Sequence, residues 1–232
     1  MTDLTGPPAV DGGPALLDRL LDGVDAADGL RLTALPFVPG VRLYLATDAV
    51  VLGARLEAEH GDRLTPPLWA DVWAGGQVLA RHIAEHPDLV AGRTVLDVAS
   101  GGGIVAITAA LAGAAKVTAN DIDPYALAAI ALNSRSNGVT VAVRAGDLLD
   151  GDGDGAEVVL AGDVFYREPM AGRMWAFLNR AVARGAHVLV GDPGRACLPM
   201  DRFAVVASYP LTMTGAGQDA QVSRAHVLRP RP

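Results

Sequence analysis

The sequence predicts an α/β domain whose sheet is doubly wound and mostly parallel. Three observations favour this fold class. Between residues 94 and 190, short apolar segments alternate with stretches of helical spacing. A glycine-rich turn directly follows the first apolar segment, and two segments of alternating side chains lie near the end of the chain. Strands separated by helices pack as a parallel sheet with right-handed crossovers.

The central elements follow one another in a regular order. Apolar segments that predict strands lie at 94–99, 116–120, 140–146, 157–161 and 187–190. Segments with helical spacing lie between them, at 103–112, 124–136 and 168–184. Two further strands, at 203–211 and 221–228, alternate around a glycine-containing loop and predict a hairpin. The hairpin should add antiparallel strands at or near one edge of the sheet.

The N-terminal part is expected to differ from this core, which we place at 93–232. Residues 1–40 are predicted to form a flexible arm, because residues 1–33 are rich in Gly, Pro, Asp and Ala. A short helix at 14–21 is the exception. Residues 41–92 are predicted to form an extension with a strand at 41–46, helices at 49–60 and 77–86, and a loop between the helices.

Composition limits the classes of function. The chain has 232 residues, of which 50% are hydrophobic, and a formal charge of −7. This balance predicts a packed core and argues against a nucleic-acid partner, which normally meets a basic face. Cys197 is the only cysteine, so no disulfide within the chain is expected. The sequence shows no signal peptide and no membrane-spanning stretch, which favours a cytoplasmic location.

A glycine-rich turn, in the segment VLDVASGGG at 95–103, is the first candidate binding element. Glycine lets a ligand approach the backbone closely, and the following helix begins there with its positive dipole end. Gly101, Gly103 and Ala106 fit a GxGxxA dinucleotide loop, which is a weak pattern by itself. A glycine-rich turn without a ligand is the plainer alternative.

Asp97 and Ala99 favour a second interpretation of the same turn. With Gly101 and Gly103 they resemble the acidic glycine-rich loop of class I S-adenosylmethionine methyltransferases. Asp97 favours this resemblance, because a carboxylate pairs with an amino-acid ammonium but repels a pyrophosphate. Ala99 stands where glycine is commonest, and we expect its φ to be negative, which a small side chain tolerates.

Acidic residues also end the next two strands. Asp121 lies twenty residues beyond Gly101, where an acid accepts hydrogen bonds from two ribose hydroxyls. Asp123 is expected to cap the following helix; a second capping role is the alternative for Asp121. Asp147 occupies the position whose acid meets the adenine amino group in many methyltransferases, and a solvated turn residue is an equal interpretation.

The segment AGDVFY at 161–166 contains a DxxY pattern at the position that would face the transferred methyl group. With WADVWAGGQ at 69–77, ANDIDP at 119–124 and VGDPGR at 190–195, it resembles the seven-stranded protein methyltransferases that include the lysine methyltransferases of the electron-transfer flavoprotein β subunit and their bacterial relatives. The resemblance extends from about residue 41 to 229. Ala74 departs from the proline of the mitochondrial members, at the substrate mouth.

Methyl transfer assigns roles to the residues around this pattern. Asp163 would hold an acceptor amine by a charge-assisted hydrogen bond and aim its lone pair. Tyr166 and Phe165 would wall the acceptor channel. Trp69 and Trp73 would offer π faces to the acceptor stem or to the sulfonium, with loop packing as their alternative.

Three further residues complete the predicted site. Gly162 belongs to the cofactor-binding turn after its strand, and Gln77 would bond the methionine carboxylate or cap its helix. Arg195 would contact a carboxylate or an acidic substrate protein, or pair with Asp192. A protein substrate predicts a wide, open mouth around Trp69, Trp73, Asp163 and Arg195, whereas a small-molecule enzyme would cover its acceptor with the 1–40 arm.

One pattern that suggests a metal site is rejected. The segment HIAEH at 82–86 matches the H-x-x-E-H of a zinc protease group, but Pro87 ends the helix and no third ligand is evident. Two solvated histidines near a helix C-terminus are expected instead, with no metal.

The sequence therefore predicts an S-adenosylmethionine-dependent N-methyltransferase that leaves S-adenosylhomocysteine as product. The resemblance implies a protein lysine as acceptor, in the electron-transfer flavoprotein β subunit or a ribosomal protein. A small-molecule N-methyltransferase is the alternative, and a non-catalytic nucleotide-binding module is the third. The sequence does not give the oligomeric state.

Overall fold

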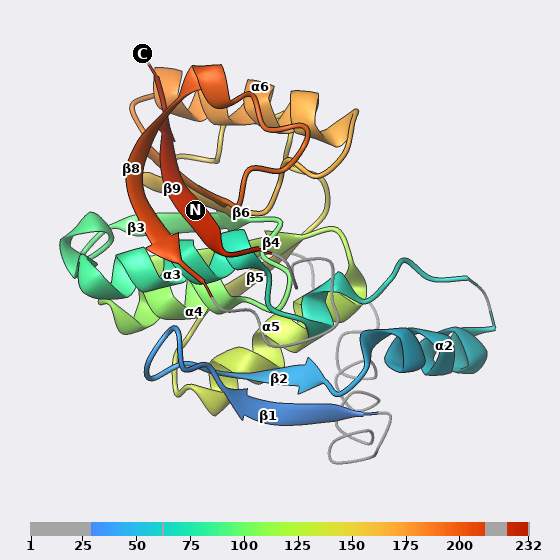
Figure 1. The fold of residues 1–232 in the computed structure, drawn as a ribbon. Helices are drawn as coiled ribbons and strands as arrows, with labels where there is room; N and C mark the ends of the chain where they lie inside the picture. Colours follow the sequence, from blue (N-terminus) through green and yellow to red (C-terminus); the bar gives the residue numbers. More distant parts are fainter. Residues whose placement is uncertain (1–28, 62, 212–221, 232) are drawn as a thin grey trace, which may run out of the picture.

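A seven-stranded sheet forms the centre of the computed structural model, which describes residues 29–61, 63–211 and 222–231 (Figure 1). The strands are β3 (Thr94–Val98), β4 (Lys116–Asp121), β5 (Ala142–Ala145), β6 (Val158–Gly162), β7 (His187–Asp192), β8 (Phe203–Pro210) and β9 (Arg224–Pro230). Their order is β5-β4-β3-β6-β7-β9-β8. Strands β3 to β7 are parallel, while β9 is antiparallel to both β7 and β8. The predicted doubly wound, mostly parallel sheet with a C-terminal hairpin is confirmed.

Helices cover both faces of this sheet (Figure 1). On one face lie α3 (Ala74–Glu85), α4 (Ile104–Leu111) and α5 (Pro124–Ser136), and on the other lies α6 (Met170–Ala183). The strands present apolar side chains to both layers: Val95 packs with the three helices, and its neighbour Leu96 faces the α6 side. This burial on both faces explains why the strands read as continuous apolar segments.

The order of the strands reverses beside β3. That strand pairs with β4 on one side and with β6 on the other, although β4 and β5 precede β6 in the chain. The connections after β3 and β6 therefore leave in opposite directions. Open α/β sheets bind their ligands at such a reversal, beyond the carboxyl ends of the strands.

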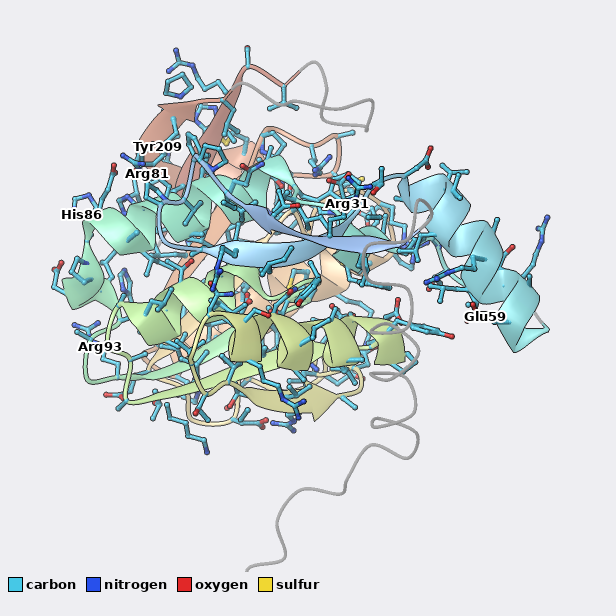
Figure 2. All side chains as sticks on the ribbon, turned by 90° about the horizontal axis from the view of Figure 1, so that it is seen from below. Arg31, Glu59, Arg81, His86, Arg93 and Tyr209 are labelled. Atoms are coloured by element: carbon cyan, nitrogen blue, oxygen red, sulfur yellow. The ribbon has the colours of Figure 1, made fainter. Side chains whose placement is uncertain are left out.

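A small antiparallel hairpin precedes the sheet. It pairs β1 (Leu30–Ala34) with β2 (Arg42–Ala46), and α2 (Ala49–His60) follows. The expectation that 30–34 belongs to an arm without regular structure is wrong, because Leu30 is fully buried and all five residues pair with β2. The predicted helix at 14–21 lies outside the described residues. Figure 2 shows α2 projecting from the body of the molecule, with Glu59 near its far end.

Helix α3 begins three residues earlier than predicted and belongs to the packed core. It contacts β7 and β9 as well as α4. Its first turn contains Gly75 and Gly76, so apolar periodicity did not reveal it. None of the helices among the described residues is long and apolar enough to cross a membrane.

Four glycines let the start of α3 lie directly on the ends of β6 and β7. A Cβ on Gly191 would come within 2.0 Å of the Gly75 carbonyl oxygen, and a Cβ on Gly162 within 2.9 Å of the Gly76 Cα. Such distances are far inside van der Waals contact. Glycine at these positions therefore permits contact between the two backbones at the edge of the sheet that carries the site.

We predict that Gly191→Ala destabilises the fold by about 3 kcal/mol or more, because the new methyl group has no space unless α3 moves away from β7. The matched control is Gly172→Ala, since Gly172 is exposed within α6. There alanine should stabilise the protein by about 1 kcal/mol through helix propensity. Urea unfolding measures both changes. A fully stable Gly191→Ala variant would contradict the close packing.

Candidate functional site

A crevice opens where the strand order reverses, beyond the carboxyl ends of β3 and β6. Its walls come from the loop after β3, the loop after β6, the segment before α3 and the N-terminal hairpin. The lining residues are Leu43, Asp71, Val72, Trp73, Gly76, Asp97, Ala99, Ser100, Gly101, Gly102, Ile104, Val105, Gly162 and Asp163. Six of the residues predicted for the site thus meet in one place: Trp73, Asp97, Ala99, Gly101, Gly162 and Asp163.

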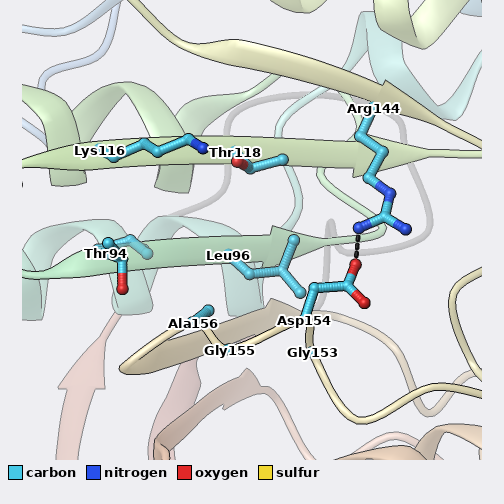
Figure 3. Close-up of a pocket in the computed structure, with 10 residues that line it drawn as sticks. Thr94, Leu96, Lys116, Thr118, Arg144, Gly153, Asp154, Gly155 and Ala156 are labelled. Atoms are coloured by element: carbon cyan, nitrogen blue, oxygen red, sulfur yellow. Dashed lines mark ion pairs between the residues drawn. The ribbon is translucent and has the colours of Figure 1, made fainter. Parts of the chain in front are cut away.

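A second hollow lies elsewhere on the sheet (Figure 3). Thr94 and Lys116, at the starts of β3 and β4, line it together with the ion pair between Arg144 and Asp154. It contains none of the predicted site residues and lies away from the carboxyl ends of the strands. We therefore place the functional site in the crevice.

Asp97 ends β3 with its side chain buried beneath the glycine-rich turn. Its Oδ2 atom accepts hydrogen bonds from the Ser100 hydroxyl and, at 3.1 Å, from the backbone N–H of Ala106 in α4. Its Oδ1 atom accepts none from any described residue, and the residue lines the crevice. Burial raises the pKa of Asp97 to about 7, and the charge of Asp121 adds to the rise, while the two hydrogen bonds oppose it.

The turn after Asp97 is more strained than expected. Ala99 has a φ of 55°, so the prediction of a negative φ is wrong. Gly101 and Gly103 also have positive φ, of 55° and 89°, so three alternate residues adopt left-handed backbone. Glycine tolerates this conformation and alanine does not, so Ala99 stores strain at the crevice wall. Strain of this kind is common at ligand-binding turns.

Asp121 fixes the same turn from the neighbouring strand. Its Oδ2 atom accepts a hydrogen bond of 2.9 Å from the N–H of Gly101, and its Oδ1 atom accepts one of 3.0 Å from that of Asp123. Burial raises the pKa of Asp121. Asp123 caps α5 by accepting from the N–H of Tyr125 at 2.8 Å, as predicted. Capping α5 is therefore the role of Asp123, and Asp121 stands beside the glycine turn.

Ile122 was not singled out by sequence reasoning. It lies between the two aspartates just after β4, and 72% of its surface is exposed. It is not among the residues that line the crevice, but it exposes an apolar surface beside Asp121. The feature of the sequence that could have identified it is an apolar residue between two aspartates in the segment ANDIDP.

Asp147 does not line the crevice. Its Oδ2 atom forms an ion pair of 2.6 Å with Arg173 in α6, and its Oδ1 atom accepts from the N–H of Leu149. The hydrogen bond from Arg173 and that from Leu149 lower the pKa of Asp147. Of the two interpretations, the structure favours a turn residue, here ion-paired with Arg173.

The two tryptophans divide between packing and the site. Trp69 is buried and stacks on Tyr125, with ring centroids 6.3 Å apart, so for this residue the packing alternative is correct. Of the four residues expected around the mouth, Trp73 and Asp163 line the crevice, and Trp69 and Arg195 do not. Trp73 lines the crevice, and its indole N–H donates to the Leu68 carbonyl at 2.8 Å. Gln77 is buried in the first turn of α3 and is not among the lining residues.

Asp163 stands at the end of β6 in left-handed backbone, with a φ of 57°. Its Oδ2 atom accepts a hydrogen bond of 2.7 Å from Gly76 and thereby caps α3, whose own N-cap residue provides no side-chain bond. Its Oδ1 atom accepts from Nη2 and Nε of Arg195 at 2.6 and 3.1 Å. Burial raises the pKa of Asp163 to about 6, and the charge of Arg195 is the largest opposing influence.

Arg195 was expected to meet an acidic substrate or to pair with Asp192. Instead, its guanidinium forms an ion pair with Asp163 and lies over the Trp73 ring, 5.5 Å from the centroid. The backbone N–H of Arg195 donates to Asp192 Oδ1 at 2.7 Å, which is a main-chain hydrogen bond and differs from the predicted side-chain ion pair.

The two aromatic residues that were predicted to line the acceptor channel lie in different environments. Phe165 is fully buried against Phe203 in the core beneath α6, so its predicted role as a channel wall is wrong. Tyr166 is 44% exposed and lies beside Arg167. Neither residue lines the crevice.

The histidines at the end of α3 form a hydrogen-bonded cluster. His82 lies 3.0 Å from the Tyr209 hydroxyl, which donates to Glu85, and Glu85 pairs with Arg81. Arg81, His86 and Tyr209 lie toward the same end of the molecule in Figure 2. His82 is buried, contrary to the expectation of two solvated histidines. Among the described residues no group of three or more His, Cys, Asp or Glu has the geometry of a metal site.

Comparison with known proteins identifies the family. The Xenopus laevis electron transfer flavoprotein beta subunit lysine methyltransferase is 37% identical over 169 residues, which cover 71% of this chain and 67% of that protein. The Caenorhabditis elegans homolog is 32% identical, over 68% of this chain and 70% of its own. The chain belongs to this family.

The rat member of the family is 40% identical over 131 residues, which cover 56% of the chain described here. The matched region spans about half the length of the rat relative, 51%. The sequence also matches the ribosomal protein L11 methyltransferase (PrmA) family over residues 83–162, which contain the glycine turn and strands β3 to β6.

A solved structure of a candidate RNA methyltransferase from Pyrococcus horikoshii shares the fold. Its TM-score is 0.50 at 16% identity, over 72% of this chain and 88% of that one. Family membership and fold thus agree with the seven-stranded, Rossmann-like methyltransferase architecture predicted from the sequence.

Ala99 gives a direct test of the strained turn in this family member. We predict that Ala99→Gly stabilises the fold by about 0.5–1 kcal/mol, because relief of the left-handed alanine outweighs the extra freedom of glycine in the unfolded chain. Ala84→Gly, at an exposed position within α3, is the control and should lose about 1 kcal/mol. Urea unfolding measures the stability of both variants. An equal loss of stability in the two variants would show that Ala99 is unstrained.

Proposed function

We propose that this protein is an S-adenosylmethionine-dependent N-methyltransferase whose acceptor is a lysine side chain of a protein. The observation that carries the proposal is the charge of the crevice. Three aspartates, Asp71, Asp97 and Asp163, are among the described residues that line it, and no Lys, Arg or His is. Arg195 offsets the charge of Asp163 from behind, so Asp71 and Asp97 give the crevice its negative charge. Such a site favours a cationic ligand and repels the pyrophosphate of a dinucleotide.

The residues of the crevice, together with Asp121 and Ile122 at the adjoining end of β4, fit S-adenosylmethionine. Asp97 lines the crevice, its Oδ1 atom accepts no hydrogen bond from a described residue, and it would hold the ammonium of the methionine moiety. Asp121, beside the glycine turn, would accept from the ribose hydroxyls, and the exposed side chain of Ile122 would cover the adenine. Gly101 and Gly102 leave the backbone accessible between these groups. Bound there, the cofactor supplies an electrophilic methyl group and leaves as S-adenosylhomocysteine.

The chain itself has to orient the acceptor and exclude water. Asp163 and Trp73, on the wall formed by β6 and the segment before α3, would flank the acceptor amine. The amine must first lose its proton, since its ordinary pKa is about 10.4. Its lone pair would then be free to attack the methyl carbon that S-adenosylmethionine supplies, with the electrons of the broken carbon–sulfur bond going to sulfur and the surplus proton to solvent.

A protein acceptor is supported by the names of the relatives. The electron transfer flavoprotein beta subunit and ribosomal protein L11 are the substrates named for them. We propose the same classes of acceptor here, in a bacterial cytoplasm and without a nucleic-acid or membrane partner. The small-molecule alternative required the 1–40 arm to cover the acceptor; residues 1–28 of that arm lie outside the described residues.

The proposal is tested by incubating the protein with methyl-labelled S-adenosylmethionine, an electron-transfer flavoprotein and a lysate that lacks the enzyme. We expect label in a protein lysine, located by mass spectrometry. Asp121→Ala should weaken cofactor binding by about 1–3 kcal/mol through loss of two charge-assisted hydrogen bonds. Asp201→Ala, at an exposed position beyond β7, is the control. Label confined to a small metabolite would refute the protein acceptor.

The raised pKa of Asp97, about 7, predicts how cofactor affinity depends on pH. Below this pKa the carboxyl group binds a proton and no longer pairs with an ammonium. The Kd for S-adenosylmethionine should therefore rise by up to about tenfold per unit as the pH falls from 7 to 5. Calorimetric titration measures it. Asp97→Asn should bind more weakly with little pH dependence, whereas an unchanged slope in that variant would exclude Asp97 as the ammonium ligand.

A further inference from the structure

Arg195 is placed by the turn that follows β7. Asp192 Oδ1 accepts the backbone N–H groups of Gly194 and Arg195, both at 2.7 Å, and Gly194 has a φ of 93°. This turn directs the arginine back toward the end of β6, where 13% of its side chain is exposed. A long cationic side chain is thus held in one place, largely out of water.

The guanidinium contacts two walls of the crevice without lining the crevice itself. It donates twice to Asp163 Oδ1 and lies over the ring of Trp73. Trp73 is fixed in turn by its indole hydrogen bond to Leu68. Arg195 therefore faces the acceptor position from behind the residues that line it, and acts on the acceptor through them.

The charge of Asp163 has a consequence for an amine beside it. An unpaired carboxylate in a buried site attracts an ammonium and holds it as an ion pair. If the proton moves to Asp163 instead, the protonated acid donates to the lone pair of the amine. In both cases a proton occupies the lone pair that methyl transfer requires.

The charged groups near Asp163 come from three sides. Arg195 reaches it from the loop after β7, while Asp97 and Asp71 line other walls of the same crevice. Asp192 ends the neighbouring strand, where its side chain holds the turn. Among the described residues, Arg195 is the cation in contact with the carboxylate, and its charge offsets that of Asp163.

We propose that Arg195 acts through Asp163 as a positioning residue that keeps the acceptor amine unprotonated. The Asp163–Arg195 pair presents a nearly neutral hydrogen-bonding wall beside the Trp73 ring. It orients a neutral amine and does not stabilise an ammonium. This inference rests on the proposed methyl transfer and adds the protonation state in which the acceptor is bound.

The first test uses Arg195→Gln and Arg195→Lys. Removing the charge should lower the KM for the acceptor protein, because its ammonium now binds, and lower kcat about tenfold at pH 8. The pH at which kcat reaches half its maximum should rise by about one unit. Lysine retains the charge and should restore most of the activity. A general loss of structure would instead raise KM and leave the pH profile in place.

The matched control is Arg202→Gln. Arg202 also lies over a tryptophan, with its Cζ 5.2 Å from the Trp175 ring, but neither residue lines the crevice. The Arg202→Gln variant should have the same KM, kcat and pH profile as the wild-type protein.

The second test does not depend on methyl transfer. The probe is n-butylamine, titrated by NMR into the protein saturated with S-adenosylhomocysteine, from pH 7 to 10. The wild-type protein should bind it more tightly as the pH rises, because it takes the neutral amine. Arg195→Gln should bind it more tightly at the lower pH, because it takes the ammonium. The same slope in both proteins would overturn the role of Arg195; absence of S-adenosylhomocysteine binding would instead overturn the proposed function.

Discussion

The buried carboxylate of Asp163 is the interaction on which the site depends. One oxygen caps α3 through Gly76, and the other receives the guanidinium of Arg195 from the loop after β7. A single side chain thereby joins three elements at the end of β6. Burying an ionised carboxyl group is unfavourable unless hydrogen bonds and a cation accompany it, and here both are present. The glycines at 75, 76, 162 and 191 let the backbones come close enough to provide them.

Two features form the crevice. One is the contact of Asp163 with α3 and with the loop after β7, and the other is the reversal of strand order beside β3. On one wall, Asp97 and Asp121 hold the strained glycine turn from the ends of β3 and β4. On the other wall, Asp163 stands in left-handed backbone. Acidic side chains thus surround accessible main chain. That combination suits a compound which carries an ammonium and a sulfonium, and the relatives of this chain are methyltransferases.

Sequence reasoning predicted the fold for a clear physical reason, because local patterns record strand burial and turn chemistry. The same patterns singled out Asp97, Gly101 and Asp163, which the fold brings to one crevice. Sequence reasoning failed where contacts between distant parts of the chain determine the position of a side chain. The ion pair of Asp147 with Arg173 brings α6 to the loop after β5. The inward direction of Phe165 and the left-handed Ala99 depend on packing and backbone geometry that no local pattern encodes.

The most direct test of this account is a crystal structure of the protein with S-adenosylhomocysteine. We expect the ammonium at Asp97 Oδ1, the ribose hydroxyls at Asp121 and the sulfur atom turned toward Asp163 and Trp73. A ligand bound in the hollow between Lys116 and Arg144, or a crevice that stays empty at saturating concentration, would contradict it.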